Sequence, residues 1–184
     1  MNVPVVAEAE PTAPAVAATE VRVAQVRVAQ VRVPEISAAG VPVSEVIADA
    51  ADGERSIVAF LCRECAYSAA AAAGNARTSL PPTIRTIMVP CTGRVSPLHL
   101  LAALAEGADG VYVAGCLEGQ CHHRVGNFHA LDRVAFVRRL LRSVGVEPER
   151  VAMFTMSAAD TPRFVATARG MDATISQLPR LPRS

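Results

Sequence analysis

The sequence predicts an α/β fold, with a parallel sheet of four or five strands and helices on both faces. Four short apolar runs alternate with helix-prone segments between Ser56 and Gly170. Each run is almost continuously apolar, which is typical of strands that are covered on both faces. Because parallel strands are joined by right-handed helical crossovers, the alternation favours a flavodoxin-like arrangement.

The expected elements are strands at 56–61, 83–90, 110–115 and 150–156 and helices at 66–77, 96–107, 125–144 and 158–170. The Ala-rich first helix should end near Gly74, and Pro81 and Pro82 mark the break before the second strand. Ser96 can cap the second helix, since Pro97 then occupies the first helical position, where proline is tolerated.

The second half of the pattern repeats this arrangement. The third strand is short and apolar, and Ser157 can cap the last helix after the turn at Pro148. The long helix between them carries apolar residues at the helical spacing. These residues are Leu131, Val134, Val137, Leu140 and Leu141.

Composition divides the chain into three parts. Residues 1–52 are rich in Ala, Val, Pro and Glu, contain no Cys, and include the repeat VRVAQ-VRVAQ-VRVPE at 21–35. We expect a flexible, low-complexity extension at 1–52, a folded domain at 53–172 and a flexible tail at 173–184. Each V-R-V unit alternates like a strand, so an arm that docks on a partner is the alternative for the repeat.

Charge and hydropathy exclude several classes of function. The formal net charge is +1, so the chain has no overall field that would attract nucleic acid. No apolar run reaches the about 18 residues that span a bilayer. The N-terminus lacks the basic and apolar regions of a secretory signal. We therefore expect a cytoplasmic protein with no nucleic-acid partner and no membrane insertion.

Five cysteines follow the ends of three predicted strands. Cys62 and Cys65 follow the first strand, Cys91 the second, and Cys116 and Cys121 the third. In a parallel sheet all carboxyl ends lie at one edge, where α/β proteins bind ligands, so the five thiols should converge there. In a reducing compartment such a group indicates metal or redox chemistry rather than disulfides.

Four thiolates are the usual ligands of an iron–sulfur cluster. We expect four of the five cysteines to hold a [2Fe–2S] cluster, because the ligands come from three separate loops; a [4Fe–4S] cluster is the alternative. Zinc is a further alternative, since His122 and His123 lie beside Cys121. A zinc-stabilised interaction or regulatory module, or a thiol-disulfide oxidoreductase acting through Cys62 and Cys65, would then replace electron transfer.

Other residues of the same loops are expected around the cluster. Gly93, Gly115 and Gly119 allow tight turns and close backbone approach, with amides that could face sulfur. Arg94 supplies positive charge, and His122 could donate a hydrogen bond to cluster sulfur. The sequence contains neither the phosphate-binding nor the nucleophile motifs of common enzymes, so no independent substrate chemistry is expected.

Three long segments carry a family resemblance. They are IVAFLCRECAYSAAAAAGNAR at 57–77, EGADGVYVAGCLEGQCHHRVGNFHA at 106–130 and SVGVEPERVAMFTMSAAD at 143–160, together with CTGRV at 91–95. Between Ile57 and Phe164 the chain resembles the delta subunit of methyl-viologen-reducing hydrogenase, the small iron–sulfur protein that partners heterodisulfide reductase.

This resemblance implies an oxidoreductase subunit with a flavodoxin-like fold and a [2Fe–2S] cluster but no flavin. It implies an electron relay from a hydrogenase or formate dehydrogenase to the heterodisulfide reductase A-like flavoprotein. The family's cysteine pattern falls on Cys62, Cys65, Cys91, Cys116 and Cys121. Which four of them bind iron stays open at this stage.

Overall fold

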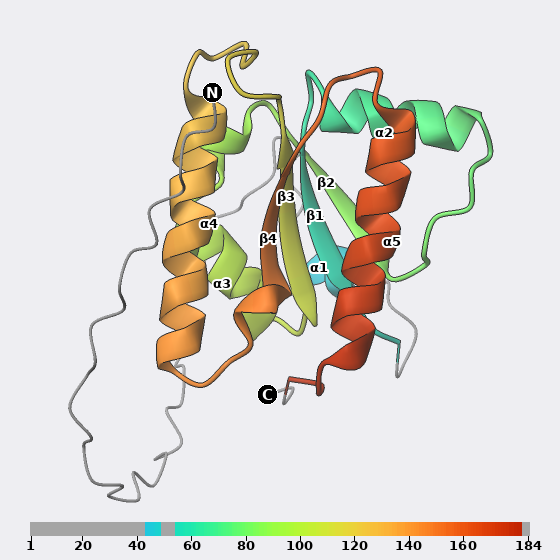
Figure 1. Cartoon of the computed structure of the whole chain (residues 1–184). Coiled ribbons are helices and arrows are strands. Elements are labelled where there is room, and N and C mark those ends of the chain that lie inside the picture. Colours follow the sequence, from blue (N-terminus) through green and yellow to red (C-terminus); the bar gives the residue numbers. More distant parts are fainter. Residues whose placement is uncertain (1–42, 49–53, 182–184) are drawn as a thin grey trace, which may run out of the picture. The chain divides into compact units, whose positions relative to one another are not determined.

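A computed structural model describes residues 43–48 and 54–181 of the chain. Within these residues four strands form one parallel sheet in the order β2-β1-β3-β4 (Figure 1). The strands are β1 (Ile57–Cys62), β2 (Ile84–Val89), β3 (Gly110–Gly115) and β4 (Val151–Thr155). The α/β prediction is confirmed, and the four described strands follow the flavodoxin-like order.

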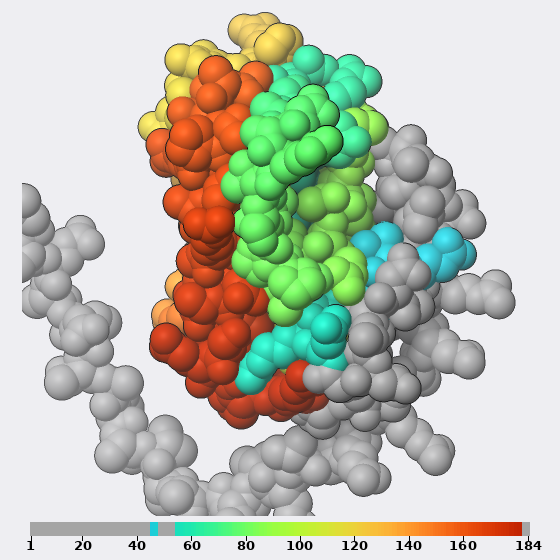
Figure 2. All heavy atoms as spheres, turned by 90° about the vertical axis from the view of Figure 1, so that its right-hand side faces the viewer, coloured from blue at the N-terminus to red at the C-terminus, as the bar shows by residue number. Residues whose placement is uncertain are grey.

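Helices cover both faces of this sheet. They are α1 (Val43–Ala48), α2 (Ala66–Asn75), α3 (Pro97–Ala105), α4 (Gly126–Ser143) and α5 (Thr161–Gln177), with short 3-10 turns η1 (Thr92–Arg94) and η2 (Pro148–Arg150). Helices α3 and α4 lie on one face and α2 and α5 on the other (Figure 1). Figure 2 shows α2 and α5 side by side.

The two central strands explain why the apolar runs are continuous. Every residue of β1 and β3 is buried. Val58 and Phe60 pack in the core beneath α3 and α4, whereas Ile57, Ala59 and Leu61 pack in the core beneath α2 and α5. Because successive side chains of a strand point to opposite faces, both faces of β1 must be apolar.

The last helix is longer than the sequence predicted. Helix α5 continues to Gln177, so residues 173–177, which we expected in a flexible tail, belong to a helix. Phe164, Ala168, Met171 and Ile175 form its buried stripe at helical spacing. Ile175 packs where a Cβ on Gly110 would stand, because that Cβ would meet its Cδ1 at 2.6 Å. The tail prediction was therefore wrong for this stretch.

The amino-terminal side of the domain also differs in one respect. Residues 43–48, which we expected within the extension, form α1, and Val46 and Ile47 pack against the core beneath α3 and α4. The repeat at 21–35 lies outside the described residues. Among the described residues, none of the helices combines the length and the apolar composition that crossing a bilayer requires.

Polar groups hold the amino-terminal edge of the sheet together. The fully buried Arg150 pairs with Glu147 at 2.8 Å and donates to the carbonyls of Asp109 (2.9 Å) and Pro179. The Asp109 carboxylate accepts the backbone N–H of Ser56 at 3.1 Å. This network links the residues that directly precede β1, β3 and β4. It lies at the edge of the sheet opposite the cysteines.

Candidate metal centre

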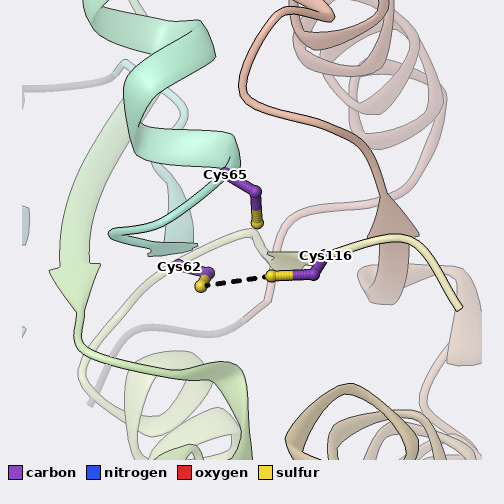
Figure 3. A group of neighbouring side chains, drawn as sticks. All are labelled: Cys62, Cys65 and Cys116. Carbon is purple, nitrogen blue, oxygen red and sulfur yellow. Dashed lines mark hydrogen bonds between the residues drawn. The ribbon is translucent and has the colours of Figure 1, made fainter. Parts of the chain in front are cut away.

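The strand ends bring three cysteines together. Cys62 is the last residue of β1, and Cys116 follows β3, the neighbouring strand. Their sulfur atoms lie 3.8 Å apart. Cys65 begins α2, and its sulfur completes a buried group in which all three sulfurs lie within 4.8 Å of one another. Figure 3 shows the three side chains pointing into a common space.

The other two cysteines form a second group. Cys91 follows β2 and caps η1, and Cys121 lies in the loop before α4. Their sulfur atoms lie 4.0 Å apart. Cys91 is buried and Cys121 is partly exposed. The predicted convergence of the thiols at one edge is therefore observed, and it takes the form of a trio and a pair.

The sulfur spacings are those of ligands that share a metal ion. Two thiolates bound at about 2.3 Å to one tetrahedral ion lie about 3.8 Å apart. The Cys62–Cys116 distance of 3.8 Å and the Cys91–Cys121 distance of 4.0 Å both fit this value. Each pair could therefore hold one metal ion.

Two glycines create the space for the Cys91–Cys121 pair. A Cβ on Gly126 would meet the Cys91 sulfur at 2.4 Å and the Cys121 sulfur at 3.4 Å. A Cβ on Gly93 would meet the Cα of Gly126 at 2.8 Å. The backbone of η1 thus packs directly on the start of α4, and a side chain at either position would displace a sulfur or the loop that carries it.

Backbone amides point at the sulfur atoms. The N–H of Gly93 donates to the Cys91 sulfur at 3.4 Å. The Cys121 sulfur accepts the N–H groups of His123, in the loop before α4, and of Gly126 and Asn127, the first two residues of α4. Amide donors of this kind stabilise anionic ligands, as they do in phosphate-binding loops.

The comparison with known proteins agrees with this donor set. Residues 57–179 match the family described as methyl-viologen-reducing hydrogenase, delta subunit. The chain belongs to this family. Among the curated relatives, the iron-sulfur D subunit of an F420-non-reducing hydrogenase from Archaeoglobus profundus is 44% identical over 125 residues, which are 68% of this chain and 91% of the relative. The iron-sulfur D subunit of the vhu hydrogenase from Methanopyrus kandleri is 43% identical over 68% of this chain and 95% of the relative.

A third relative is a much longer chain. The A subunit of a ferredoxin/F420H2-dependent CoB-CoM heterodisulfide reductase from Methanosarcina acetivorans is 42% identical over 111 residues. These residues are 60% of this chain but 14% of that relative. A region similar to this delta-subunit chain is therefore part of a heterodisulfide reductase polypeptide in that organism.

Two residues of the delta-subunit site had not been expected from the sequence. Asn127 is buried, and its side-chain amide donates to the carbonyls of Cys116 (3.3 Å) and Leu117 (3.0 Å), which fixes the loop after β3. Arg133 donates from α4 to the carbonyl of Gly93 at 2.6 Å and so fixes the Cys91 loop. Neither belongs to a cysteine motif, and only the fold shows which loops they hold.

The residues expected around the cysteines divide into two sets. Gly93 contacts the site as described, and a Cβ on Gly115 would meet the Thr92 side chain at 2.9 Å, so Gly115 lets η1 approach β3. Arg94 is the exposed last residue of η1, His122 is an exposed loop residue, and Gly119 is an exposed turn residue with φ of +72°. A role for the latter three toward a cluster stays a prediction.

Hydrogen bonding and burial make the thiols of the trio unequal. A hydrogen bond from the Cys65 thiol lowers the pKa of Cys62 to about 6, with help from the amides of Glu64 and Thr92. The same bond raises the pKa of Cys65, and burial raises that of Cys116 to about 11. The first thiolate therefore forms most readily at Cys62.

In the pair the two thiols differ as well. Burial raises the pKa of Cys91. Burial also raises the pKa of Cys121, but the amides at the start of α4 outweigh it, so that its pKa is lowered overall. The pairs Cys62–Cys116 and Cys91–Cys121 thus each contain one thiol whose pKa is lowered and one whose pKa burial raises. A metal ion would supply the positive charge that both need.

Proposed function

We propose that this chain is an electron carrier whose cysteines hold a [2Fe–2S] cluster. The observation that carries the proposal is that two different pairs of sulfurs, Cys62–Cys116 and Cys91–Cys121, lie 3.8 Å and 4.0 Å apart. In a single zinc site with four thiolates, all ligands would share one spacing. Two separate pairs, each with one-metal spacing, fit a cluster with two iron ions.

In this proposal Cys62 and Cys116 would hold one iron and Cys91 and Cys121 the other. The cluster would supply a one-electron redox centre. The chain positions the sulfurs through β1, β3 and the start of α4, and the amides of Gly93, Gly126 and Asn127 stabilise their negative charge. We propose that the domain expected at 53–172, extended to the end of α5, is sufficient to hold the cluster, because the proposed ligands and their amide donors all lie within it.

A partner would dock over the same edge of the sheet. The helices that begin there expose large apolar side chains in their first turns or directly before them. These are Tyr67 (40% exposed), Leu98 (59%), Val125 (50%) and Phe128 (41%). Exposed apolar residues that surround a functional site are typical of a protein interface.

The relatives support the choice of partner. Because a similar region occurs within the A chains of heterodisulfide reductases, we propose an A-like flavoprotein as one redox partner. The hydrogenase subunits among the relatives support a hydrogenase as the donor. A formate dehydrogenase as the donor, and a cytoplasmic location, also belong to this proposal.

Electron transfer between purified proteins tests the function. The dithionite-reduced protein should be reoxidised by an A-like flavoprotein, measured by stopped-flow absorbance under anoxic conditions. Phe128→Ser should slow this step at least about 10-fold, the effect of losing one interface hot spot. The matched control is Phe136→Ser, which changes another exposed Phe (49%) about 12 Å further along α4. Equal slowing by both variants would refute docking at this edge of the sheet. No electron transfer from the wild type would refute the proposed function.

A further inference from the structure

We infer that Cys65 is not an iron ligand and that its thiol donates a hydrogen bond to the ligand sulfurs of Cys62 and Cys116, which sets the reduction potential of the centre. The inference rests on the proposed [2Fe–2S] cluster. A cluster of this type takes four thiolates, and the chain offers five. The structure distinguishes the fifth by its position.

Cys65 differs from the other four cysteines in its place in the fold, because Cys62, Cys91 and Cys116 end or follow strands, Cys121 pairs with Cys91, and Cys65 is the N-cap residue of α2. Each of the others belongs to a pair with one-metal spacing, at 3.8 Å or 4.0 Å. The sulfur of Cys65 lies beside one complete pair, within 4.8 Å of both of its members. Figure 3 shows its side chain reaching toward Cys62 and Cys116 from the start of α2. When Cys62 and Cys116 bind one iron, the Cys65 sulfur beside them is placed to contact these two ligand sulfurs, and no iron position is left for it.

Cys116 is the ligand that needs such a donor. The Cys62 sulfur accepts the N–H groups of Glu64 and Thr92, and the sulfurs of Cys91 and Cys121 accept N–H groups from their own loops. The hydrogen-bonding neighbours of the Cys116 sulfur are instead the thiols of Cys65 and Cys62. Once Cys62 is bound to iron as a thiolate it has no proton to donate. The thiol of Cys65 then donates to the Cys116 sulfur the hydrogen bond that backbone amides donate to the other ligand sulfurs.

The surroundings of Cys65 suit a neutral thiol. It is 3% exposed and packs in the apolar core with Ala66 and Ala69 of α2. Its backbone is held on both sides, because its N–H donates to the carbonyl of Cys62 at 3.3 Å and its carbonyl accepts the N–H of Ala69 at 3.0 Å. A free cysteine behaves as a small apolar residue with a weak S–H donor, so this position holds the donor in place.

The consequence is an effect on the redox potential. Hydrogen bonds to ligand sulfur stabilise the reduced cluster, which carries the greater negative charge, and so raise its potential. Loss of the Cys65 donor should therefore shift the potential to a more negative value without loss of iron. Loss of a ligand should remove iron.

Two variants of the full chain test the inference. Cys65→Ala should keep two irons per chain and the EPR signal of the reduced cluster, with a more negative midpoint potential in a redox titration. Cys65→Ser retains an O–H donor and should recover most of the shift. Cys91→Ala is the control that removes a ligand, and it should lose iron. In the reduced wild type, ENDOR should detect an exchangeable proton coupled to the cluster that is absent from Cys65→Ala.

The outcomes separate this inference from the proposed function. Iron loss from Cys65→Ala with retained α/β circular dichroism would make Cys65 a ligand and overturn the inference. An unchanged potential in a variant with two irons would overturn the hydrogen bond. If Cys65→Ala does not accumulate, Cys65→Val, which is apolar, has a similar volume and has no donor, takes its place in the same measurements. Wild-type protein without iron would instead refute the proposed function itself.

Discussion

The two edges of the same sheet are built from different kinds of residue. At the carboxyl edge, glycines let the loops pack closely around free thiols and the backbone amides that face them. At the amino edge, Arg150, Glu147 and Asp109 satisfy one another and the nearby carbonyls. The first edge offers ligands for a cofactor, and the second links the starts of the strands. Function and stability should therefore respond to changes at different edges.

The largest expected effect is at Gly126. Gly126→Ala would place a Cβ 2.4 Å from the Cys91 sulfur, so the Cys91–Cys121 pair cannot keep its spacing. We expect iron to fall from two per chain to nearly none, measured by metal analysis of anoxically purified protein. Gly170→Ala in α5 is the matched control, because nothing lies within 4 Å of its Cβ. It should keep both irons and gain up to about 1 kcal/mol of stability. Full iron in Gly126→Ala would refute the described packing.

Arg150→Met tests the opposite edge. The substitution leaves the Glu147 carboxylate and the carbonyls of Asp109 and Pro179 without their donor. We expect the free energy of unfolding to fall by about 2–4 kcal/mol, while the visible spectrum of the folded protein stays unchanged. Urea unfolding followed by circular dichroism measures the loss. Arg142→Met, on the exposed side of α4, should change stability by less than about 0.5 kcal/mol. A change of spectrum in Arg150→Met would show that the two edges are coupled.

Arg133 should have a smaller effect on the cluster. Its guanidinium holds the carbonyls of Gly93 (2.6 Å) and Val95 (3.0 Å), and so keeps the Cys91 loop against α4. Arg133→Met should release iron to a chelator roughly 10-fold faster, as is usual when a residue that orients ligands is lost. Arg139→Met removes an exposed Arg from the same helix and should leave the release rate unchanged. Equal rates in the two variants would mean that the loop holds its shape without Arg133.

The smallest expected effect is at Tyr112. Its hydroxyl is buried and has no hydrogen-bond partner among the described residues, and burial raises its pKa. Tyr112→Phe should therefore increase the free energy of unfolding by about 1 kcal/mol, measured by urea unfolding. The exposed Tyr67 offers the control, since Tyr67→Phe should not change stability. Destabilisation by Tyr112→Phe would indicate that the hydroxyl has a partner, such as a buried water molecule.

The sequence predicted the cysteine site at the carboxyl edge of the sheet, but it did not predict the Arg150 network at the amino edge. Strand ends and cysteines coincide along the chain, and parallel topology then requires the thiols to meet. The grouping into a trio and a pair depends on loop conformation, which the spacing of cysteines does not specify. Asn127 and Arg133 act on loops distant in sequence, so no local pattern reveals them. The end of α5 was missed although its apolar stripe continues, because the polar residues around Met171 and Ile175 resemble those of a tail.

Quantitative EPR of the anoxically purified full chain, combined with iron analysis, tests the central claim most directly. We predict two irons per chain, a silent spectrum in the oxidised protein and, after reduction, a signal that integrates to one unpaired electron per chain. Zinc in place of iron, or a chain that binds neither metal, would contradict the assignment of this sheet edge to electron transfer.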